Sequence, residues 1–298
     1  MIDYSSHTEE YLSRTRHIVS PALREKKVAI IGCGAGSYMA IKLARCASPA
    51  QMILVDFDHV EWANLSRTAY TVGDVGKLKV IALKDRISEA NPFVGVESLP
   101  IDFCAANWAE YDSMLEGVDL IVAGTDQFAA QAKINRVSQE LGTPAVFIGI
   151  HAGAEGGRVI WSLPGKTACY RCVAAERYNR QEADGEQAVN LDAAHGLLPD
   201  VQYIDMLALK VCVAILDRDQ NSAMGRFFAD MSGRNEIIIR CSPEYEHGSA
   251  LWDAILADLP TAPKPYADEI KREALFSMDT IWLSTERNPD CPDCNPHR

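Results

Sequence analysis

A glycine-rich turn between two apolar runs constrains the fold of this chain more than any other feature. Residues 28–31 read Val-Ala-Ile-Ile and lead directly into residues 32–37, Gly-Cys-Gly-Ala-Gly-Ser. A second apolar run, residues 52–55, ends on Asp56. The order strand, glycine turn, helix, strand, acid is typical of the nucleotide-binding half of a Rossmann-type sheet. In such a sheet the glycines let backbone N–H groups approach phosphates, and the acid accepts ribose hydroxyls.

The residues that follow Asp56 indicate which class of nucleotide-dependent enzyme this is. Asn64 and Arg67 lie in one short segment, and Lys79 lies at the start of the next helical pattern. A dinucleotide-dependent dehydrogenase has no need of an arginine and a lysine that converge beyond the ribose acid. An enzyme that cleaves a triphosphate does need them, because negative charge must be held as pyrophosphate leaves. The sequence therefore favours an ATP-cleaving enzyme.

The composition is that of a folded, acidic protein. The chain has 298 residues, of which 48% are hydrophobic and 23% charged, and a formal net charge of −12. This balance argues against nucleic acid or a membrane surface as a partner, since both attract basic patches. Residues 1–7 lack the features of a secretory signal, and no apolar run approaches the roughly 20 residues of a membrane span. We therefore expect a cytoplasmic protein, built as a single domain over residues 1–298.

Four of the nine cysteines form two pairs with the spacing of metal ligands. Cys169 and Cys172 make one Cys-x-x-Cys pair, and Cys291 and Cys294 make another near the C-terminus. Each pair allows two thiolates to share a tetrahedral metal ion, so together they predict a four-cysteine Zn2+ site. Two unrelated surface pairs, or redox chemistry at one pair, are the alternatives. Because the pairs are far apart in sequence, the metal would fasten the C-terminal tail to the body of the domain.

Strand-like and helix-like patterns alternate over the first half of the chain. We expect strands at residues 28–31, 52–55, 94–99, 119–123 and 145–148, and helices after the glycine turn, at 78–89 and at 134–141. This alternation predicts an α/β fold: a Rossmann-like, mostly parallel sheet with helices on both faces.

The pattern changes after residue 149. Further strands at 158–161, 236–240 and 280–283, with an apolar helix at 206–216, predict an antiparallel C-terminal extension of the sheet. Three segments stand apart from this pattern, and they are an N-terminal helical arm (1–25), a polar crossover loop (174–196) and a helical insertion (242–278).

Taken in order, the polar markers resemble those of the ThiF/MoeB/HesA family of adenylyltransferases, which are relatives of the ubiquitin-activating enzymes. The markers are the glycine turn, Asp56, Asn64-x-x-Arg67, Lys79, Thr125-Asp126 and the two Cys-x-x-Cys pairs. The resemblance runs from Ser13 to Cys294, apart from the insertion at 242–278. It implies a homodimer that uses Mg2+ and ATP to adenylate a carboxylate. The substrate would be a small ubiquitin-like or sulfur-carrier protein, or a peptide, with a free C-terminus of the Gly-Gly kind.

The resemblance also implies how the nucleotide is seated. Gly32, Gly34 and Gly36 would let the backbone approach ATP, and Asp56 would accept the ribose hydroxyls. The glycine turn is one residue shorter than the Gly-x-Gly-Gly-x-Gly turn that is usual in the family, which alters the seating of the phosphates.

Five polar residues carry the chemistry that the resemblance implies. Asn64, Arg67 and Lys79 would hold phosphates while charge moves onto the departing pyrophosphate, and Asp126 would hold Mg2+. Arg14 takes the place of the family's N-terminal arginine, which reaches into the ATP site of the partner subunit. The attacking carboxylate is already a nucleophile and needs no general base. The plainer readings are a helix N-cap for Asp126 and solvated surface charges for the three basic residues.

Two further positions depart from the family pattern. Gln127 stands where the family commonly has asparagine, and the crossover loop has no catalytic cysteine, since none occurs between Cys172 and Cys212. Cys241 follows a predicted strand and could be an exposed thiol that carries the acyl group. We favour instead an enzyme without a self-thioester, whose adenylate is attacked directly by an external nucleophile.

Two other functions compete with adenylation. An NAD-dependent oxidoreductase would use Asp56 but leaves Arg67, Lys79 and Asp126 without a role. A non-catalytic module that binds a ubiquitin-like protein would keep the fold but would not need the phosphate and Mg2+ positions. The sequence identifies neither the acyl partner nor the fate of the adenylate.

Overall fold

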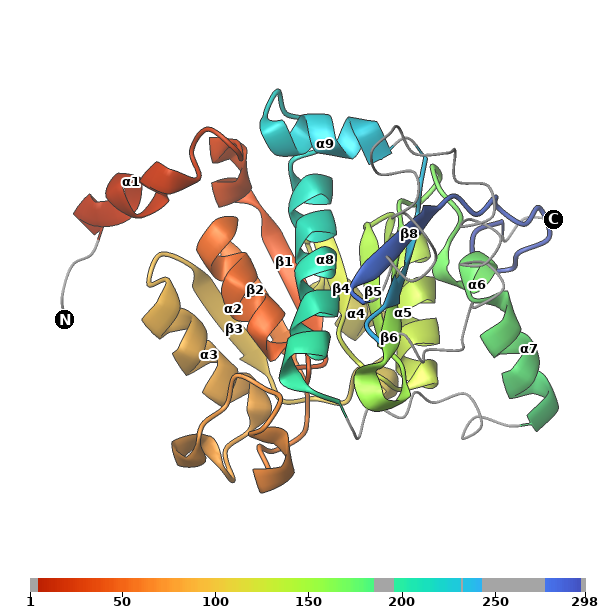
Figure 1. The fold of residues 1–298 in the computed structure, drawn as a ribbon, viewed down its shortest axis with the longest axis horizontal. Coiled ribbons are helices and arrows are strands. Elements are labelled where there is room, and N and C mark those ends of the chain that lie inside the picture. Colours follow the sequence, from red (N-terminus) through yellow and green to blue (C-terminus); the bar gives the residue numbers. More distant parts are fainter. Residues whose placement is uncertain (1–4, 185–195, 232, 243–276, 296–298) are drawn as a thin grey trace, which may run out of the picture.

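Eight strands form one sheet in the computed structural model, which describes residues 5–184, 196–231, 233–242 and 277–295. Their order in the sheet is β3-β2-β1-β4-β5-β6-β7-β8 (Figure 1). The strands are β1 (Lys27–Ile31), β2 (Gln51–Val55), β3 (Gly95–Leu99), β4 (Leu120–Ala123), β5 (Ala145–Ile150), β6 (Gly156–Ser162), β7 (Glu236–Arg240) and β8 (Asp279–Leu283).

The strands from β3 to β5 run parallel to one another. In β1, Val28 and Ile30 face one hydrophobic core while Ala29 and Ile31 face the other, as the two-residue period of a strand requires. From β1 the chain proceeds to β2 on one side and later to β4 on the other. The carboxyl ends of these strands therefore meet at a point where the strand order reverses, which is where open α/β sheets bind ligands.

The remaining strands, β6 to β8, extend the sheet in antiparallel fashion. Pairings such as Phe147 with Ile160 and Ile237 with Trp282 continue the sheet without a break. Both the parallel half and the antiparallel extension were predicted from the sequence, and both are confirmed.

Helices cover both faces of the sheet (Figure 1). On one face lie α2 (Ser37–Cys46), α3 (Lys79–Ala90), α8 (Leu198–Leu216) and α9 (Ala223–Met231). On the other lie α4 (Trp108–Met114), α5 (Phe128–Leu141), α6 (Tyr170–Val173) and α7 (Ala175–Asp184). Within the described ranges no helix combines the length and the apolar character that crossing a membrane requires.

The structure corrects several expected boundaries. Helix α7 occupies the first part of the segment expected to be a crossover loop, because Tyr178 anchors it: the tyrosine is buried and its ring lies 4.8 Å from that of Phe128. The rest of that loop and almost all of the insertion, residues 185–195 and 243–276, lie outside the described residues. Helices α5 and α8 begin six and eight residues earlier than predicted, at 128 and 198.

The N-terminal arm is a series of short helical turns rather than one helix. Between residues 5 and 25 they are Ser5–His7, α1 (Thr8–Tyr11), Leu12–Arg14 and Pro21–Glu25. The arm contacts the body of the domain through Tyr11, whose hydroxyl donates to the Ala90 carbonyl at 2.8 Å.

Candidate functional site

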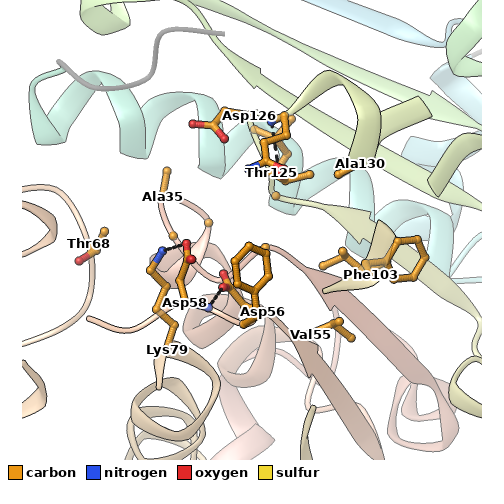
Figure 2. Close-up of a pocket in the computed structure, with 18 of the residues that line it drawn as sticks. Ala35, Val55, Asp56, Asp58, Thr68, Lys79, Phe103, Thr125, Asp126 and Ala130 are labelled. Carbon is orange, nitrogen blue, oxygen red and sulfur yellow. Dashed lines mark hydrogen bonds and ion pairs between the residues drawn. The ribbon is translucent and has the colours of Figure 1, made fainter. Parts of the chain in front are cut away.

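A pocket opens at the carboxyl ends of β2, β1 and β4 (Figure 2). The residues predicted to bind the nucleotide come together here, and the pocket is lined by Gly32, Gly34, Gly36, Asp56, Asn64, Arg67, Lys79 and Asp126. In Figure 2, Thr125 and Asp126 lie across the cavity from Asp56, Asp58 and Lys79. Residues that are far apart in the sequence thus meet around one cavity.

The three glycines of the turn play different parts. Gly32 has φ +91°, and a Cβ there would lie 2.8 Å from the backbone carbonyl carbon and oxygen of Gly124, so only glycine fits. A Cβ on Gly34 would meet nothing within 4 Å, and one on Gly36 only the Cα of Gly124 at 3.9 Å. Folding therefore requires Gly32 to be glycine, whereas Gly34 and Gly36 leave open space beside the backbone.

Asp56 is oriented by the backbone on both sides. The Cys33 N–H donates to its Oδ2 at 2.7 Å and the Asp58 N–H donates to its Oδ1 at 2.8 Å. Each carboxylate oxygen can accept a further hydrogen bond, so Asp56 can receive hydroxyl groups from the pocket side.

Lys79 and Asp58 form an ion pair beside this acid. The Lys79 Nζ lies 2.7 Å from the Asp58 Oδ2, and the lysine side chain is only 12% exposed (Figure 2). The Lys79 N–H also donates to the Asp58 carbonyl at 2.8 Å. Asp58 thus holds the ammonium at the pocket wall, and the remaining N–H groups of Lys79 can bind phosphate oxygens.

Asn64 and Arg67 lie on a loop between β2 and α3. The Asn64 Oδ1 accepts from the Glu61 N–H at 2.9 Å, which shapes the turn that precedes Arg67. Over the described ranges the Arg67 guanidinium is half-buried and has no acidic partner. An arginine at a pocket wall without a counter-ion is suited to binding an anion.

Asp126 follows β4 and is exposed to the pocket. Helix α5 begins at Phe128 with Gln127 in the N-cap position, and no side-chain oxygen caps it. The N-cap role considered for Asp126 is therefore wrong, and its carboxylate is available to a ligand.

Sequence reasoning missed Asp205, a further acid that lines the pocket from α8. Its side chain is fully buried, and burial raises its pKa to about 8 while the charge of Lys42 lowers it. The only signal in the sequence was that this acid interrupts an otherwise apolar stretch, residues 204–209. The periodicity of that stretch did not show that the acid faces the pocket.

The four predicted metal ligands form one cluster. Their sulfur atoms all lie within 4.8 Å of one another, and the separations are 3.8 Å for Cys169–Cys172, 3.6 Å for Cys169–Cys291 and 3.7 Å for Cys172–Cys294. Thiolates around a tetrahedral ion at about 2.3 Å are about 3.8 Å apart, whereas a disulfide joins sulfurs at about 2.05 Å. The cluster could therefore hold a metal ion.

A line of polar contacts along α5 connects this cluster to the pocket. The Asn135 Nδ2 donates to Asp293 at 2.8 Å, and its Oδ1 accepts from the Tyr170 N–H at 2.9 Å. The Tyr170 hydroxyl donates to the Gln131 Oε1 at 2.7 Å, and the Gln131 Nε2 donates to the Thr125 carbonyl at 2.8 Å. We call these contacts the α5 ladder; it ends on the residue before Asp126.

Comparison with known proteins identifies the family. The sequence matches the model of the ThiF family over residues 12–246. The chain belongs to the ThiF family. It is 31% identical over 296 residues to ubiquitin-like modifier-activating enzyme 5 of Drosophila sechellia, covering 92% of this chain and 70% of that protein.

Other relatives match over a shorter range. The Caenorhabditis elegans protein of the same name is 33% identical over 160 residues, which are 51% of this chain but only 38% of that protein. Among solved structures, Escherichia coli MccB with ATP superposes with a TM-score of 0.62 at 18% identity, over 92% of this chain and 68% of that one. PaaA has a TM-score of 0.61 at 20% identity, over 80% of this chain and 81% of that one. These two likenesses show a common fold.

Two predicted residues of this ThiF-family chain do not reach the pocket. Arg14 is exposed in the N-terminal arm and does not line the cavity of its own chain. The alternative that Cys241 is an exposed thiol is wrong: it is 6% exposed, and burial raises the pKa of its thiol to about 12. It lies directly after β7, and its N–H donates to the Glu155 carbonyl at 2.7 Å.

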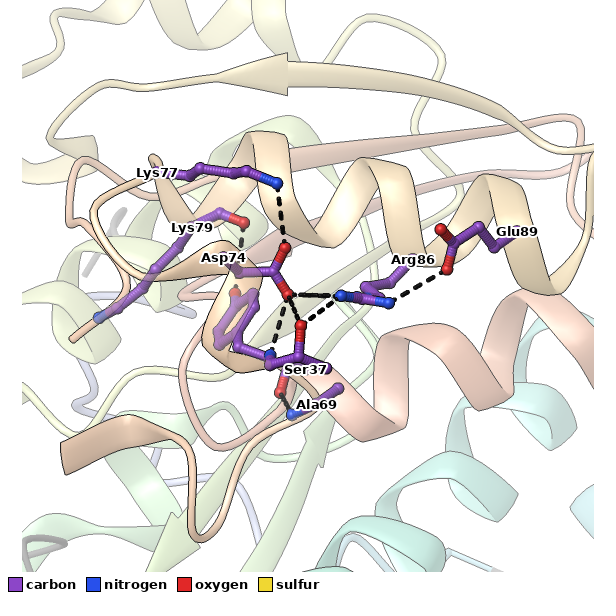
Figure 3. A network of polar contacts seen from close by, with 9 residues as sticks. Ser37, Ala69, Asp74, Lys77, Lys79, Arg86 and Glu89 are labelled. Carbon is purple, nitrogen blue, oxygen red and sulfur yellow. Dashed lines mark hydrogen bonds and ion pairs between the residues drawn. The ribbon is translucent and has the colours of Figure 1, made fainter. Parts of the chain in front are cut away.

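The loop that carries Asn64 and Arg67 is anchored by a buried acid, Asp74 (Figure 3). Its Oδ2 accepts from the Thr71 N–H at 2.9 Å and from the Arg86 Nη2 at 2.7 Å, and its Oδ1 from the Lys77 Nζ at 3.2 Å. Burial alone would raise the pKa of Asp74, but the hydrogen bonds from Arg86, Thr71 and Lys77 hold it well below its ordinary value of 3.8.

Neighbouring residues tie the same loop to the glycine turn. The Ala69 N–H donates to the Ser37 Oγ at 2.9 Å (Figure 3). The buried Tyr70 hydroxyl lies within hydrogen-bonding distance of the Cys33 and Lys79 carbonyls. The Asp74 network therefore positions the basic side of the pocket relative to the turn.

We predict that Asp74→Asn destabilises the protein at pH 7 by on the order of 2–4 kcal/mol, because it removes the buried charge that pairs with Arg86 and leaves that arginine with only the exposed Glu89 as an acidic partner over the described ranges. The folded-state pKa is depressed, so this contribution is fully present above the unfolded-state pKa near 4, and it declines progressively as the pH falls from there towards the folded-state pKa. Thermal unfolding at pH 7 and pH 3 measures the effect, with Asp85→Asn, an exposed acid on the helix that carries Arg86, as control. A destabilisation of equal size at both pH values would contradict the assignment.

Proposed function

We propose that this ThiF-family protein is an ATP-dependent adenylyltransferase. It would activate the C-terminal carboxylate of a small ubiquitin-like or sulfur-carrier protein, or of a peptide, and release pyrophosphate. The observation that carries the proposal is the meeting of the open glycine turn, Asp56, Arg67, Lys79 and Asp126 around one pocket. The names of the relatives, which are ubiquitin-like modifier-activating enzymes, and the solved complexes of MccB with ATP and with AMPCPP and MccA, support the same chemistry.

The geometry suits charge stabilisation rather than proton transfer. A carboxylate oxygen of the acyl substrate attacks the α-phosphorus of ATP; the new O–P bond forms as the bond to the oxygen that bridges to the β-phosphate breaks. Arg67 and Lys79 neutralise the pyrophosphate that departs, with Asn64 beside them. The backbone at Gly34 can come close to the phosphates because no side chain intervenes.

Asp56 and Asp126 act at the two ends of the nucleotide. Asp56, held by two backbone N–H groups, accepts the ribose hydroxyls. Asp126, exposed at the end of β4, supplies carboxylate oxygens of the kind that bind Mg2+, which when bound offsets phosphate charge.

An enzyme of the nicotinamide-dependent class fits this pocket less well. It would leave Arg67, Lys79 and the exposed Asp126 without a role in the chemistry. A non-catalytic binding module would have no use for a half-buried arginine that lacks a counter-ion. Adenylation gives each of these groups a role.

The positions of the cysteines indicate which nucleophile attacks the adenylate. The sequence has no cysteine between Cys172 and Cys212, and Cys241 is buried. We propose that an external nucleophile attacks the adenylate directly. The structure joins none of the nine cysteines in a disulfide, which supports a reducing, cytoplasmic location.

Two further elements belong to the proposal. The enzyme would act as a homodimer in which Arg14, exposed on the N-terminal arm, enters the pocket of the partner subunit. The cysteine cluster would hold Zn2+, since its sulfur separations match those of a tetrahedral site.

Adenylation should depend on Asp126 and Arg67. We expect Asp126→Ala and Arg67→Ala each to lower ATP–pyrophosphate exchange about 100- to 1,000-fold, because each removes a group that stabilises charge in the transition state. The assay uses the small protein recovered with the wild type by pulldown, intact and lacking its last two residues. Lys84→Ala, an exposed charge on the helix that Lys79 begins, is the matched control. Near-normal exchange in both variants, or exchange that survives removal of the partner's C-terminus, would contradict the proposal.

Metal removal should loosen the C-terminal tail without unfolding the domain, because the sheet has its own large core. Elemental analysis should find about one zinc per chain. Cys294→Ser should lose the metal and speed hydrogen exchange over residues 277–295, whereas Cys104→Ser, an exposed cysteine outside the cluster, should change neither. A metal-free wild type with a fully protected tail would mean that the two pairs do not form a metal site.

A further inference from the structure

Asp205 has no hydrogen-bond partner that the structure describes. Its side chain is 0% exposed, it lines the pocket, and both of its carboxylate oxygens are without a hydrogen bond over the described ranges. Lys42, whose charge acts on Asp205, donates its hydrogen bond to the Gln202 Oε1 at 2.9 Å instead. Leaving a buried carboxyl unpaired costs folding free energy, and this cost is tolerated where a ligand supplies the missing bond.

The position of Asp205 indicates which ligand group this is. Asp205 lines the pocket together with Ile148 and Ile150 of β5, and Ile204, the residue before it on α8, packs beside the carboxyl end of that strand. Asp56 ends β2, the glycine turn ends β1 and Asp126 follows β4, so the proposed ribose, phosphate and Mg2+ positions run along the sheet edge towards β5. With strands about 4.8 Å apart, the β5 end lies roughly 14 Å from the ribose acid, beyond the phosphates. If the proposed function holds, this end receives the acyl substrate.

The hydrogen-bonding capacity of the Asp205 carboxyl further restricts which ligand group can bind it. A triphosphate presents only oxygen acceptors, so it could accept from the protonated Asp205 carboxyl but would leave the carbonyl oxygen of that carboxyl without a donor. A peptide presents an N–H donor and a carbonyl acceptor at each residue. Because burial holds the pKa of Asp205 near 8, at pH 7 its carboxyl offers a matching acceptor and donor.

We propose that Asp205 is a specificity residue for the acyl substrate, and that its carboxyl hydrogen-bonds the last amide N–H before the substrate's C-terminal carboxylate. This inference rests on the proposed adenylation. It predicts that the protein selects carboxylates at the end of a peptide chain over carboxylates that lack this amide.

The test uses a stable mimic of the acyl-adenylate as the probe. N-acetyl-glycyl-glycine joined to 5′-sulfamoyladenosine keeps the last amide N–H, and its analogue methylated on that nitrogen does not. Calorimetry at pH 7 measures the affinity of both compounds, and of AMP, for the wild type, Asp205→Leu and Asp205→Asn. Asn keeps an acceptor and a donor in the same shape, whereas Leu keeps only the volume.

We expect the wild type to bind the N–H compound about 10- to 100-fold more tightly than the N-methyl compound, the range for a hydrogen bond to a buried group that can carry charge. Asp205→Leu should bind the two alike, Asp205→Asn should retain the preference, and all three proteins should bind AMP equally, which also shows that they are folded. A wild type without the preference, or a Leu variant that keeps it, would overturn the inference while AMP binding leaves the proposed function standing. Failure of the wild type to bind AMP would overturn both.

Discussion

The close contact between two backbone turns determines the shape of the pocket. Gly32 at the end of β1 and Gly124 at the end of β4 lie so near each other that neither tolerates a Cβ without displacing the other's backbone. The Gly32 N–H donates to the Val55 carbonyl at 2.9 Å and the Gly124 N–H to the Ile31 carbonyl at 2.8 Å, so the turn is held between the ends of its two neighbouring strands. Asp56 and Asp126 take their places on either side of this contact.

Two polar networks position the side chains of the pocket relative to the contact between Gly32 and Gly124. On one side, Asp74 fastens the loop of Asn64 and Arg67 to α3, and Tyr70 connects that loop to the turn. On the other, the α5 ladder runs from the cysteine cluster to the Thr125 carbonyl. The domain thus holds the two walls of the site by separate means, a buried ion pair and a cluster that could hold a metal.

The sequence was sufficient for those features that depend on local order. The alternation of strands and helices predicted the sheet. Each Cys-x-x-Cys pair is recognisable by its local spacing, and the two pairs were expected to meet because each supplies only half of a four-ligand metal site. Asp205 and Cys241 escaped prediction because their burial is decided by packing between distant segments, which one sequence does not show. Helix α7 was not predicted because its sequence is mostly polar. One buried side chain, Tyr178, attaches it to the domain by packing on Phe128.

Binding of Mg-ATP, compared with NAD, tests the central claim that this turn and pocket seat a triphosphate. Calorimetry should show that the wild type binds Mg-ATP and not NAD. Gly34→Val should abolish ATP binding without lowering the melting temperature, because a side chain there meets only the open pocket. A preference for NAD, or a Gly34→Val protein that binds Mg-ATP as the wild type does, would contradict the account.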